Sequence, residues 1–219
     1  MLAAFFDLDG CLVDSRAAIS GAINHALTTL GVRERPPEQL YGFIGPPLVH
    51  TFEALLASEG QDPARAPQAI EAYREEYRDG ALRLTTVVPG VESALAGLSG
   101  HLAVRVVTSK PVEQARAIVQ ALGLDRWVEE VHGPDLSALT EPKSVKLEAA
   151  LAQVGCAQPH DRPQTAMIGD RLHDVQAGQA CGTATVGVTW GIGDCAELTG
   201  AGADHVIDRP DQLAAILLD

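Results

Sequence analysis

Short apolar runs rich in β-forming residues alternate with segments of helical spacing along most of this chain. In one such segment Val91, Leu95 and Leu98 share a helical face, and the segment ends near Gly100, as helices commonly do. Strands that alternate with helices favour a parallel sheet covered by helices. The predicted fold class is therefore α/β, with a Rossmann-like three-layer core. The expected strands are 2–8, 102–108, 128–132, 165–169, 183–188 and 204–207.

The region 16–85 breaks this alternation, because helical spacing runs throughout it and no convincing strand is present. One of its apolar stripes consists of Ile19, Ile23, Leu27 and Leu30. Since the region follows directly after the first strand and its loop, both of its ends return to the sheet. The predicted domains are a core of 1–15 and 86–219 and a small all-helical insert of 16–85.

Charge and composition limit the classes of partner. The formal net charge is -13, from 29 acidic and 16 basic side chains, so most of the surface repels a nucleic-acid backbone. A small anion is still possible, because a bound cation and a few lysines can reverse the potential inside a pocket. No apolar stretch approaches the roughly 18 residues of a membrane span. Four scattered cysteines and the lack of a basic leader at the N-terminus predict a cytoplasmic location, and no pattern indicates an oligomeric state.

The first motif places two carboxylates at the end of an apolar strand, in the sequence FFDLDGCLVDS. Asp7, Asp9 and Gly10 can all lie at the carboxyl edge of the sheet, where open α/β sheets bind ligands. A Ca²⁺ loop would need glycine at the sixth position, whereas here it stands at the fourth. Two solvated aspartates in a loop are the alternative for this motif taken alone.

Two further elements supply hydroxyl and lysine groups. A second apolar strand ends in Thr108, Ser109 and Lys110, whose hydroxyl and backbone N–H groups can hold phosphate oxygens or simply begin a helix. Lys143 opens a later helix, where an anionic partner is plausible because a lysine there opposes the helix dipole. Lys146 is a nearby alternative.

The fourth element is TAMIGDRLHD, an apolar strand that ends before Asp170, with Asp174 four residues later. The two carboxylates can serve a hard divalent cation as ligand and support, or they can stabilise a helix N-terminus. Chance explains any one of these four elements easily. Together and in this order, they bring to one sheet edge the groups that phosphoryl transfer needs.

In these motifs the chain resembles the haloacid dehalogenase superfamily, in its phosphoglycolate phosphatase-like branch. The segments DLDGCLVDS, VVTSK, Lys143 and GDRLHD resemble its four motifs, and 16–85 is similar to its small helical cap. The resemblance implies a Mg²⁺-dependent phosphatase that hydrolyses a small phosphate monoester, of phosphoglycolate or nucleotide type, through an aspartyl phosphate. It also identifies FIGPPL, residues 43–48, as the substrate-facing loop of the cap. Elsewhere in the region 16–85, Asn24, Tyr41 and His50 are candidate polar contacts for a substrate.

Carried over by position, the resemblance implies a role for each motif residue. Asp7 would attack phosphorus, and Asp9 would act as general acid and then as general base. The carboxylates of Asp7 and Asp170 and the backbone carbonyl of Asp9 would hold Mg²⁺, with Asp174 supporting the site. The remaining groups would bind the phosphoryl oxygens or balance their charge: Gly10, Thr108, Ser109, Lys110 and Lys143.

Other functions on the same fold are weighed against this one. A dehalogenase needs neither a second aspartate nor Mg²⁺, so Asp9 and Asp170 argue against it. A phosphomutase of the β-phosphoglucomutase type shares the catalytic residues, and an inorganic pyrophosphatase shares the chemistry. A non-catalytic binding module would be expected to have lost a catalytic position, and none is missing.

Overall fold

The computed structural model describes residues 1–135 and 141–218. The chain forms two compact units, a core unit of 1–14 and 86–219 and a helical unit of 15–85. The first boundary thus lies one residue before the expected position, and the second coincides with it. The catalytic and substrate-selecting roles expected of the two units stay predictions.

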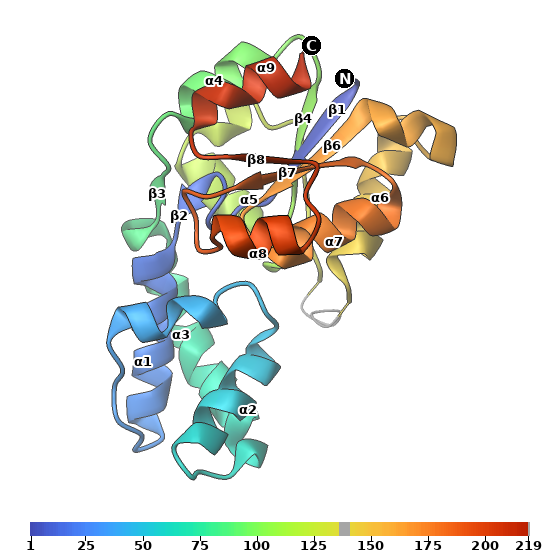
Figure 1. Ribbon diagram of the computed structural model, residues 1–219. Coiled ribbons are helices and arrows are strands. Elements are labelled where there is room, and N and C mark those ends of the chain that lie inside the picture. The colour runs from blue at the N-terminus through green and yellow to red at the C-terminus, as the bar shows by residue number, and fades with distance from the viewer. Residues whose placement is uncertain (136–140, 219) are drawn as a thin grey trace. The chain divides into compact units, whose positions relative to one another are not determined.

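The core unit is built on a sheet of six parallel strands in the order β5-β4-β1-β6-β7-β8 (Figure 1). Every expected strand is present, and most are shorter at their ends than the apolar runs that predicted them. The chain fills one side of β1 and then crosses to the other, so the carboxyl ends of β4, β1 and β6 are neighbours. The strands are β1 (Ala3–Phe6), β4 (Ala103–Val107), β5 (Glu130–His132), β6 (Thr165–Gly169), β7 (Ala184–Val188) and β8 (His205–Ile207).

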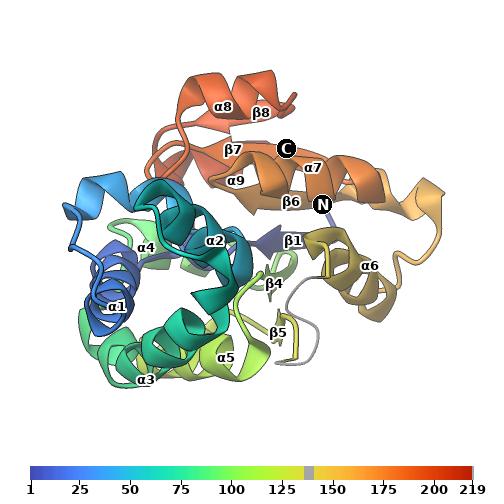
Figure 2. The same ribbon diagram turned by 90° about the horizontal axis from the view of Figure 1, so that it is seen from below.

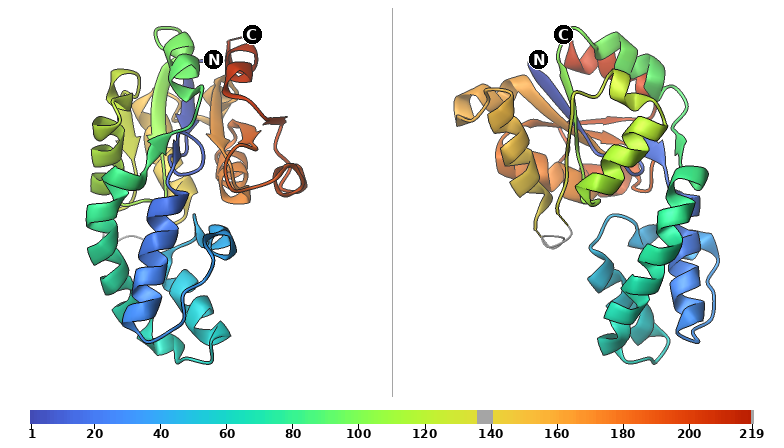
Figure 3. Two further views of the ribbon diagram at one scale, coloured as in Figure 1. Left: turned by 90° about the vertical axis from the view of Figure 1, so that its left-hand side faces the viewer. Right: turned by 180° about the vertical axis from the view of Figure 1, so that it is seen from behind.

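Helices cover both faces of this sheet, which confirms the three-layer prediction (Figure 3). Successive side chains of a strand point to opposite faces. Accordingly, Ala4 and Phe6 pack in one apolar cluster with α4, α5 and α9, while Ala3 and Phe5 pack in another with α6 and α7. The helices are α4 (Val91–Leu98), α5 (Val112–Ala121), α6 (Lys143–Gln153), α7 (Leu172–Cys181), α8 (Cys195–Gly200) and α9 (Leu213–Leu217), with 3₁₀ turns η4 (Leu124–Arg126), η5 (Pro159–Gln164) and η6 (Pro210–Gln212).

A short antiparallel ribbon, absent from the prediction, lies where the chain leaves and re-enters the core unit. It pairs β2 (Val13–Asp14) with β3 (Thr86–Val87), in the register Val13 to Val87 and Asp14 to Thr86. Strands of two residues are too short to show an alternating pattern in a sequence. The ribbon ties the two chain crossings to each other within the core unit.

The helical unit contains α1 (Arg16–Thr29), α2 (Leu48–Ser58) and α3 (Ala66–Leu84), with 3₁₀ turns η1 (Pro37–Gln39), η2 (Tyr41–Phe43) and η3 (Pro63–Arg65). The third helix packs against both others (Figure 2). All of 15–85 is described and contains no strand, as predicted. Ile19, Ile23 and Leu27 of the apolar stripe are buried, whereas Leu30 is partly exposed. The Tyr73 and Tyr77 rings stack with centroids 5.3 Å apart. None of the helices in the described part of the chain is both long and apolar enough to cross a membrane.

Candidate active site at the carboxyl edge of the sheet

Three neighbouring strands each end in a buried polar residue. Asp7 follows β1, Thr108 follows β4, and Asp170 follows β6. The backbone N–H of Asp7 still donates to Ile168 O (2.8 Å), and that of Thr108 to His132 O (2.9 Å), so both residues are held at the edge of the sheet. The juxtaposition expected from the sequence is therefore observed for these three residues.

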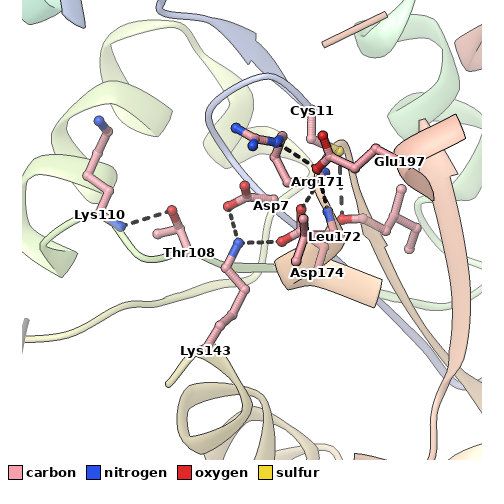
Figure 4. A network of polar contacts seen from close by, with 10 residues as sticks. Asp7, Cys11, Thr108, Lys110, Lys143, Arg171, Leu172, Asp174 and Glu197 are labelled. Atoms are coloured by element: carbon pink, nitrogen blue, oxygen red, sulfur yellow. Dashed lines mark hydrogen bonds and ion pairs between the residues drawn. The ribbon is translucent and has the colours of Figure 1, made fainter. Parts of the chain in front are cut away.

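Lys143 places a cation among the carboxylates. It is the first residue of α6, and its Nζ lies 2.9 Å from Asp7 Oδ1 and also donates to Asp174 Oδ1 (Figure 4). Burial alone would lower the pKa of Lys143, but the two carboxylates raise it above its ordinary value. Lys146 instead pairs with Glu141. Of the two candidate lysines, Lys143 is thus the one that contacts the aspartates.

Asp7, Asp170 and Asp174 form a buried group in which one carboxylate oxygen of each residue lies within 4.8 Å of those of the other two. Burial raises the pKa of Asp7 to about 6, and the neighbouring carboxylates add to this while Lys143 opposes it. Burial likewise raises the pKa of Asp170 to about 8, with Asp174 and Asp7 contributing. One lysine therefore does not compensate the negative charge of three buried carboxylates.

This donor set suits a hard divalent cation. Asp170 Oδ1 is buried and accepts no hydrogen bond from the residues that the structure describes. Carboxylate oxygens are the ligands that Mg²⁺ prefers, and a cation beside Asp7 and Asp170 would offset the electrostatic cost of their burial. Asp174 differs, because Lys143 holds its Oδ1 and the backbone N–H of Arg171 donates to its Oδ2 (3.0 Å). Its place at the start of α7 fits support of the site and also fits the alternative, a helix-capping role.

The remaining predicted residues surround this group. Asp9 pairs with Lys110, whose Nζ lies 2.8 Å from Asp9 Oδ2. The backbone N–H of Lys110 donates to Thr108 Oγ1 (3.2 Å), whereas the side chain of Ser109 is exposed. Gly10 has φ +86°, and a Cβ on it would lie 2.2 Å from Asp170 Oδ2, so glycine is needed there for both conformation and space.

Sequence reasoning missed the loop that follows β7. The backbone N–H of Ile192 donates to Asp170 Oδ2 (2.7 Å). A Cβ on Gly191 would lie 2.3 Å from that oxygen, and one on Gly193 would lie 2.0 Å from Asp170 O. Trp190 Nε1 donates to Cys11 O (2.9 Å), which joins this loop to the first motif. The loop therefore fixes the position of Asp170.

Glu197 on α8 extends the same support. Its Oε1 accepts hydrogen bonds from Arg171 Nε (2.8 Å) and from the backbone N–H of Leu172 (2.9 Å), as Figure 4 shows. The sequence did carry a signal for this region, since TWGIGD is a glycine-rich segment after an apolar strand of the same sheet. Its role becomes visible only when Asp170 is placed beside it.

Known proteins share this architecture. A model of the haloacid dehalogenase-like hydrolase family matches residues 4–188. A 5'-nucleotidase of Pseudomonas aeruginosa is 36% identical over 194 residues, or 88% of this chain and 85% of that protein. A phosphoglycolate phosphatase of Chromobacterium violaceum is 30% identical over 215 residues, or 96% of this chain and 94% of that protein. The structure of a haloacid dehalogenase-like family hydrolase from Streptococcus pneumoniae aligns with a TM-score of 0.90 at 26% identity, covering 99% and 98% of the two chains.

The family model spans most of the chain, and the relatives match over nearly their full lengths. Both curated relatives carry names of phosphate-ester hydrolases, and the resemblance stated from the motifs is confirmed. The chain therefore belongs to the haloacid dehalogenase-like hydrolases and is a phosphatase of their phosphoglycolate phosphatase-like branch.

Proposed function

We propose that this phosphatase is Mg²⁺-dependent and hydrolyses small phosphate monoesters through a phosphoryl group carried on Asp7. The observation that carries the proposal is the placement of Asp7: its buried carboxylate contacts Lys143, lies beside Asp170, and stands at a sheet edge two residues before Asp9. A nucleophile, a cation and a proton-transferring group are what the two displacements at phosphorus require.

In the first step, a carboxylate oxygen of Asp7 attacks phosphorus while the ester P–O bond breaks. Asp9 gives its proton to the departing oxygen, which leaves as an alcohol. In the second step Asp9 takes a proton from water, the water oxygen attacks phosphorus, and the bond from phosphorus to Asp7 breaks. Inorganic phosphate and the original carboxylate result.

The other residues prepare these steps. Lys143 opposes the rise in the pKa of Asp7 and so favours the ionised nucleophile. Thr108 already accepts the N–H of Lys110, which leaves its hydroxyl proton to donate to a phosphoryl oxygen. When bound, Mg²⁺ would be held by the carboxylates of Asp7 and Asp170 with the carbonyl of Asp9, and would supply positive charge against the phosphate.

We propose that the helical unit selects the substrate. The side-chain contacts of its three candidate residues show which of them are better suited to bind a substrate. Asn24 is engaged with the chain itself, because its side chain donates to Arg35 O (2.8 Å) and accepts from Arg35 N (2.9 Å). Tyr41 lies under the guanidinium of Arg16, 5.6 Å from ring centroid to Cζ. His50 is exposed beside Glu53. Both the amide nitrogen and the amide oxygen of Asn24 are thus hydrogen-bonded within its own unit, and we propose Tyr41 and His50 over Asn24 as substrate contacts.

Phosphate release from a panel of phosphate compounds tests the proposed function. The panel contains the esters phosphoglycolate and nucleoside monophosphates, together with the anhydride pyrophosphate, each with Mg²⁺ or with EDTA. We expect turnover that needs Mg²⁺ and that Asp7→Asn abolishes, because the neutral amide cannot form the phosphoryl intermediate. Asp125→Asn, at an exposed aspartate, is the matched control and should keep full activity. Turnover by Asp7→Asn, or equal turnover in EDTA, would contradict the proposal.

A further inference from the structure

Lys110 and Asp9 form an ion pair that is largely shielded from solvent. The Nζ of Lys110 lies 2.8 Å from Asp9 Oδ2, and only 6% and 13% of the two side chains are exposed. The pair joins the loop after β4 to the loop after β1, two neighbouring strands. Separating the two side chains would leave each charge shielded from water and without its partner, which is unfavourable. The ion pair therefore restrains both side chains.

The backbone of Lys110 is itself held in place. Its N–H donates to Thr108 Oγ1, as Figure 4 shows, and Pro111 follows with φ restricted by its ring. On the other side, a Cβ on Gly133 would lie 2.6 Å from Lys110 O, so the chain after β5 packs directly against this carbonyl. The ammonium group therefore extends from a fixed point of the backbone.

The two oxygens of Asp9 have different surroundings. Oδ2 contacts Lys110, whereas Oδ1 is buried and has no hydrogen-bond partner among residues 1–135 and 141–218. A carboxylate held by one oxygen keeps one orientation, and its second oxygen is then left to exchange a proton with a bound reactant. Catalytic groups need such support, because small errors in their orientation cost large factors in rate.

We propose that Lys110 is a positioning residue for Asp9, and that Oδ1 of Asp9 is the atom that transfers the proton. This inference rests on the proposed function. The proton on Oδ1 passes to the ester oxygen as the ester P–O bond breaks and the bond from Asp7 to phosphorus forms. Oδ1 then accepts a proton from the water that displaces Asp7. The resemblance implied a phosphate contact for Lys110, whereas the ion pair favours a role of its charge toward Asp9.

Two esters that differ in their leaving group test the inference. p-Nitrophenyl phosphate releases a stable phenolate and needs little help from an acid, whereas an alkyl phosphate needs the proton. The kcat/KM value of each ester reports the first displacement, in which the leaving oxygen is protonated. Because only the alkyl ester depends on this proton, Lys110→Met should lower kcat/KM more for the alkyl ester than for the aryl ester. We expect a loss of about 10²-fold for the alkyl ester and less than about threefold for the aryl ester, because general acid catalysis contributes about 10²–10⁴-fold where the leaving oxygen must be protonated.

A double-mutant cycle separates positioning from direct contact with phosphate. In the Asp9→Asn background, Lys110→Met should cause no further loss with the alkyl ester, because the group that it positions is gone. Lys110→Arg retains the charge and should restore part of the alkyl-ester activity. Lys146→Met changes a residue of α6 and breaks its pair with Glu141; it is the matched control and should leave the hydrolysis of both esters unaffected.

Equal losses with both esters, or losses that multiply with those of Asp9→Asn, would overturn the inference and favour a phosphate contact. If the wild type hydrolyses neither ester, the proposed function fails, and a crystal structure of Lys110→Met then decides the positioning role. An Asp9 carboxylate that turns away from its wild-type orientation supports the inference, and an unchanged one overturns it.

Discussion

Two buried hydroxyls of the helical unit and the buried carboxylates of the core unit differ in how their polar atoms are compensated. In the helical unit, Ser20 Oγ donates to Arg16 O (2.6 Å) and Thr51 Oγ1 donates to Phe43 O (3.3 Å), so each group is satisfied by nearby backbone. In the core unit, Asp7, Asp170 and Asp174 are gathered around one lysine. The first arrangement stabilises a fold, whereas the second costs stability and is expected only where a site needs the charges.

Removing the one lysine of the carboxylate group should produce the largest effect. Lys143→Met leaves three buried carboxylates without their cation, and we expect it to lower the free energy of unfolding by about 3–5 kcal/mol, as for other broken buried ion pairs. Activity should be lost as well. Urea denaturation in EDTA measures the change. Lys146→Met is the control, because it removes a lysine of the same helix whose partner is Glu141 rather than the aspartate group.

Mg²⁺ sharpens this test. A cation bound by Asp7 and Asp170 would replace part of the missing charge, so Mg²⁺ should raise the urea midpoint of Lys143→Met. Equal stability of Lys143→Met and Lys146→Met in EDTA would show that the carboxylates do not depend on Lys143, and the contrast between the two units would lose its basis.

Two glycines, one in each unit, give the second comparison, because they differ in the space available for an added Cβ. A Cβ on Gly191 would lie 2.3 Å from Asp170 Oδ2 and 2.4 Å from Gly10 O, so Gly191→Ala should destabilise the protein by about 1–3 kcal/mol, as overpacking does. A Cβ on Gly21 in α1 would meet nothing within 4 Å. Gly21→Ala should stabilise the protein by about 0.5–1 kcal/mol, since alanine favours a helix.

A metal-binding measurement makes the glycine comparison specific to the site. Calorimetric titration with Mn²⁺ should show weaker binding for Gly191→Ala than for the wild type, because Asp170 must move, and unchanged binding for Gly21→Ala. If Gly191→Ala binds Mn²⁺ as the wild type does, the loop after β7 does not position Asp170.

The parts of the site that the sequence predicted have strong local signals. Asp7, Thr108 and Asp170 each follow an apolar run, and the carboxyl ends of parallel strands must meet at one edge. Lys143 opens a helix whose spacing is readable. For these residues, the fold class alone is enough to predict that the side chains lie close together.

The remaining parts depend on contacts between distant segments. Nothing near Gly191 in the sequence says that Asp170 Oδ2 will lie against it, and the pairing of Lys110 with Asp9 joins loops after two different strands. The ribbon of β2 and β3 was missed for another reason, because two residues per strand show no period. Tertiary proximity decides these features, and a single sequence does not display it.

Histidines give the last and smallest contrast. His25 and His50 of the helical unit are exposed, whereas His132 of the core unit is buried at the end of β5. Burial lowers the pKa of His132 below its ordinary value of 6.5, and Arg105 and Arg116 act in the same direction while Glu130 opposes them. Between the folded and unfolded pKa values the unfolded chain binds more protons, so His132 reduces stability as the pH falls below 6.5.

His132→Asn should remove this contribution. The raised pKa values of Asp7 and Asp170 act in the opposite sense, because the folded state then binds more protons as the pH falls, but wild type and variant share them. Urea midpoints in EDTA at about pH 8 and about pH 5.5, which bracket the ordinary histidine pKa, measure the difference. The wild type should lose more stability on acidification than His132→Asn does. Parallel changes in the two proteins would mean that His132 is protonated as readily in the folded state as in the unfolded chain.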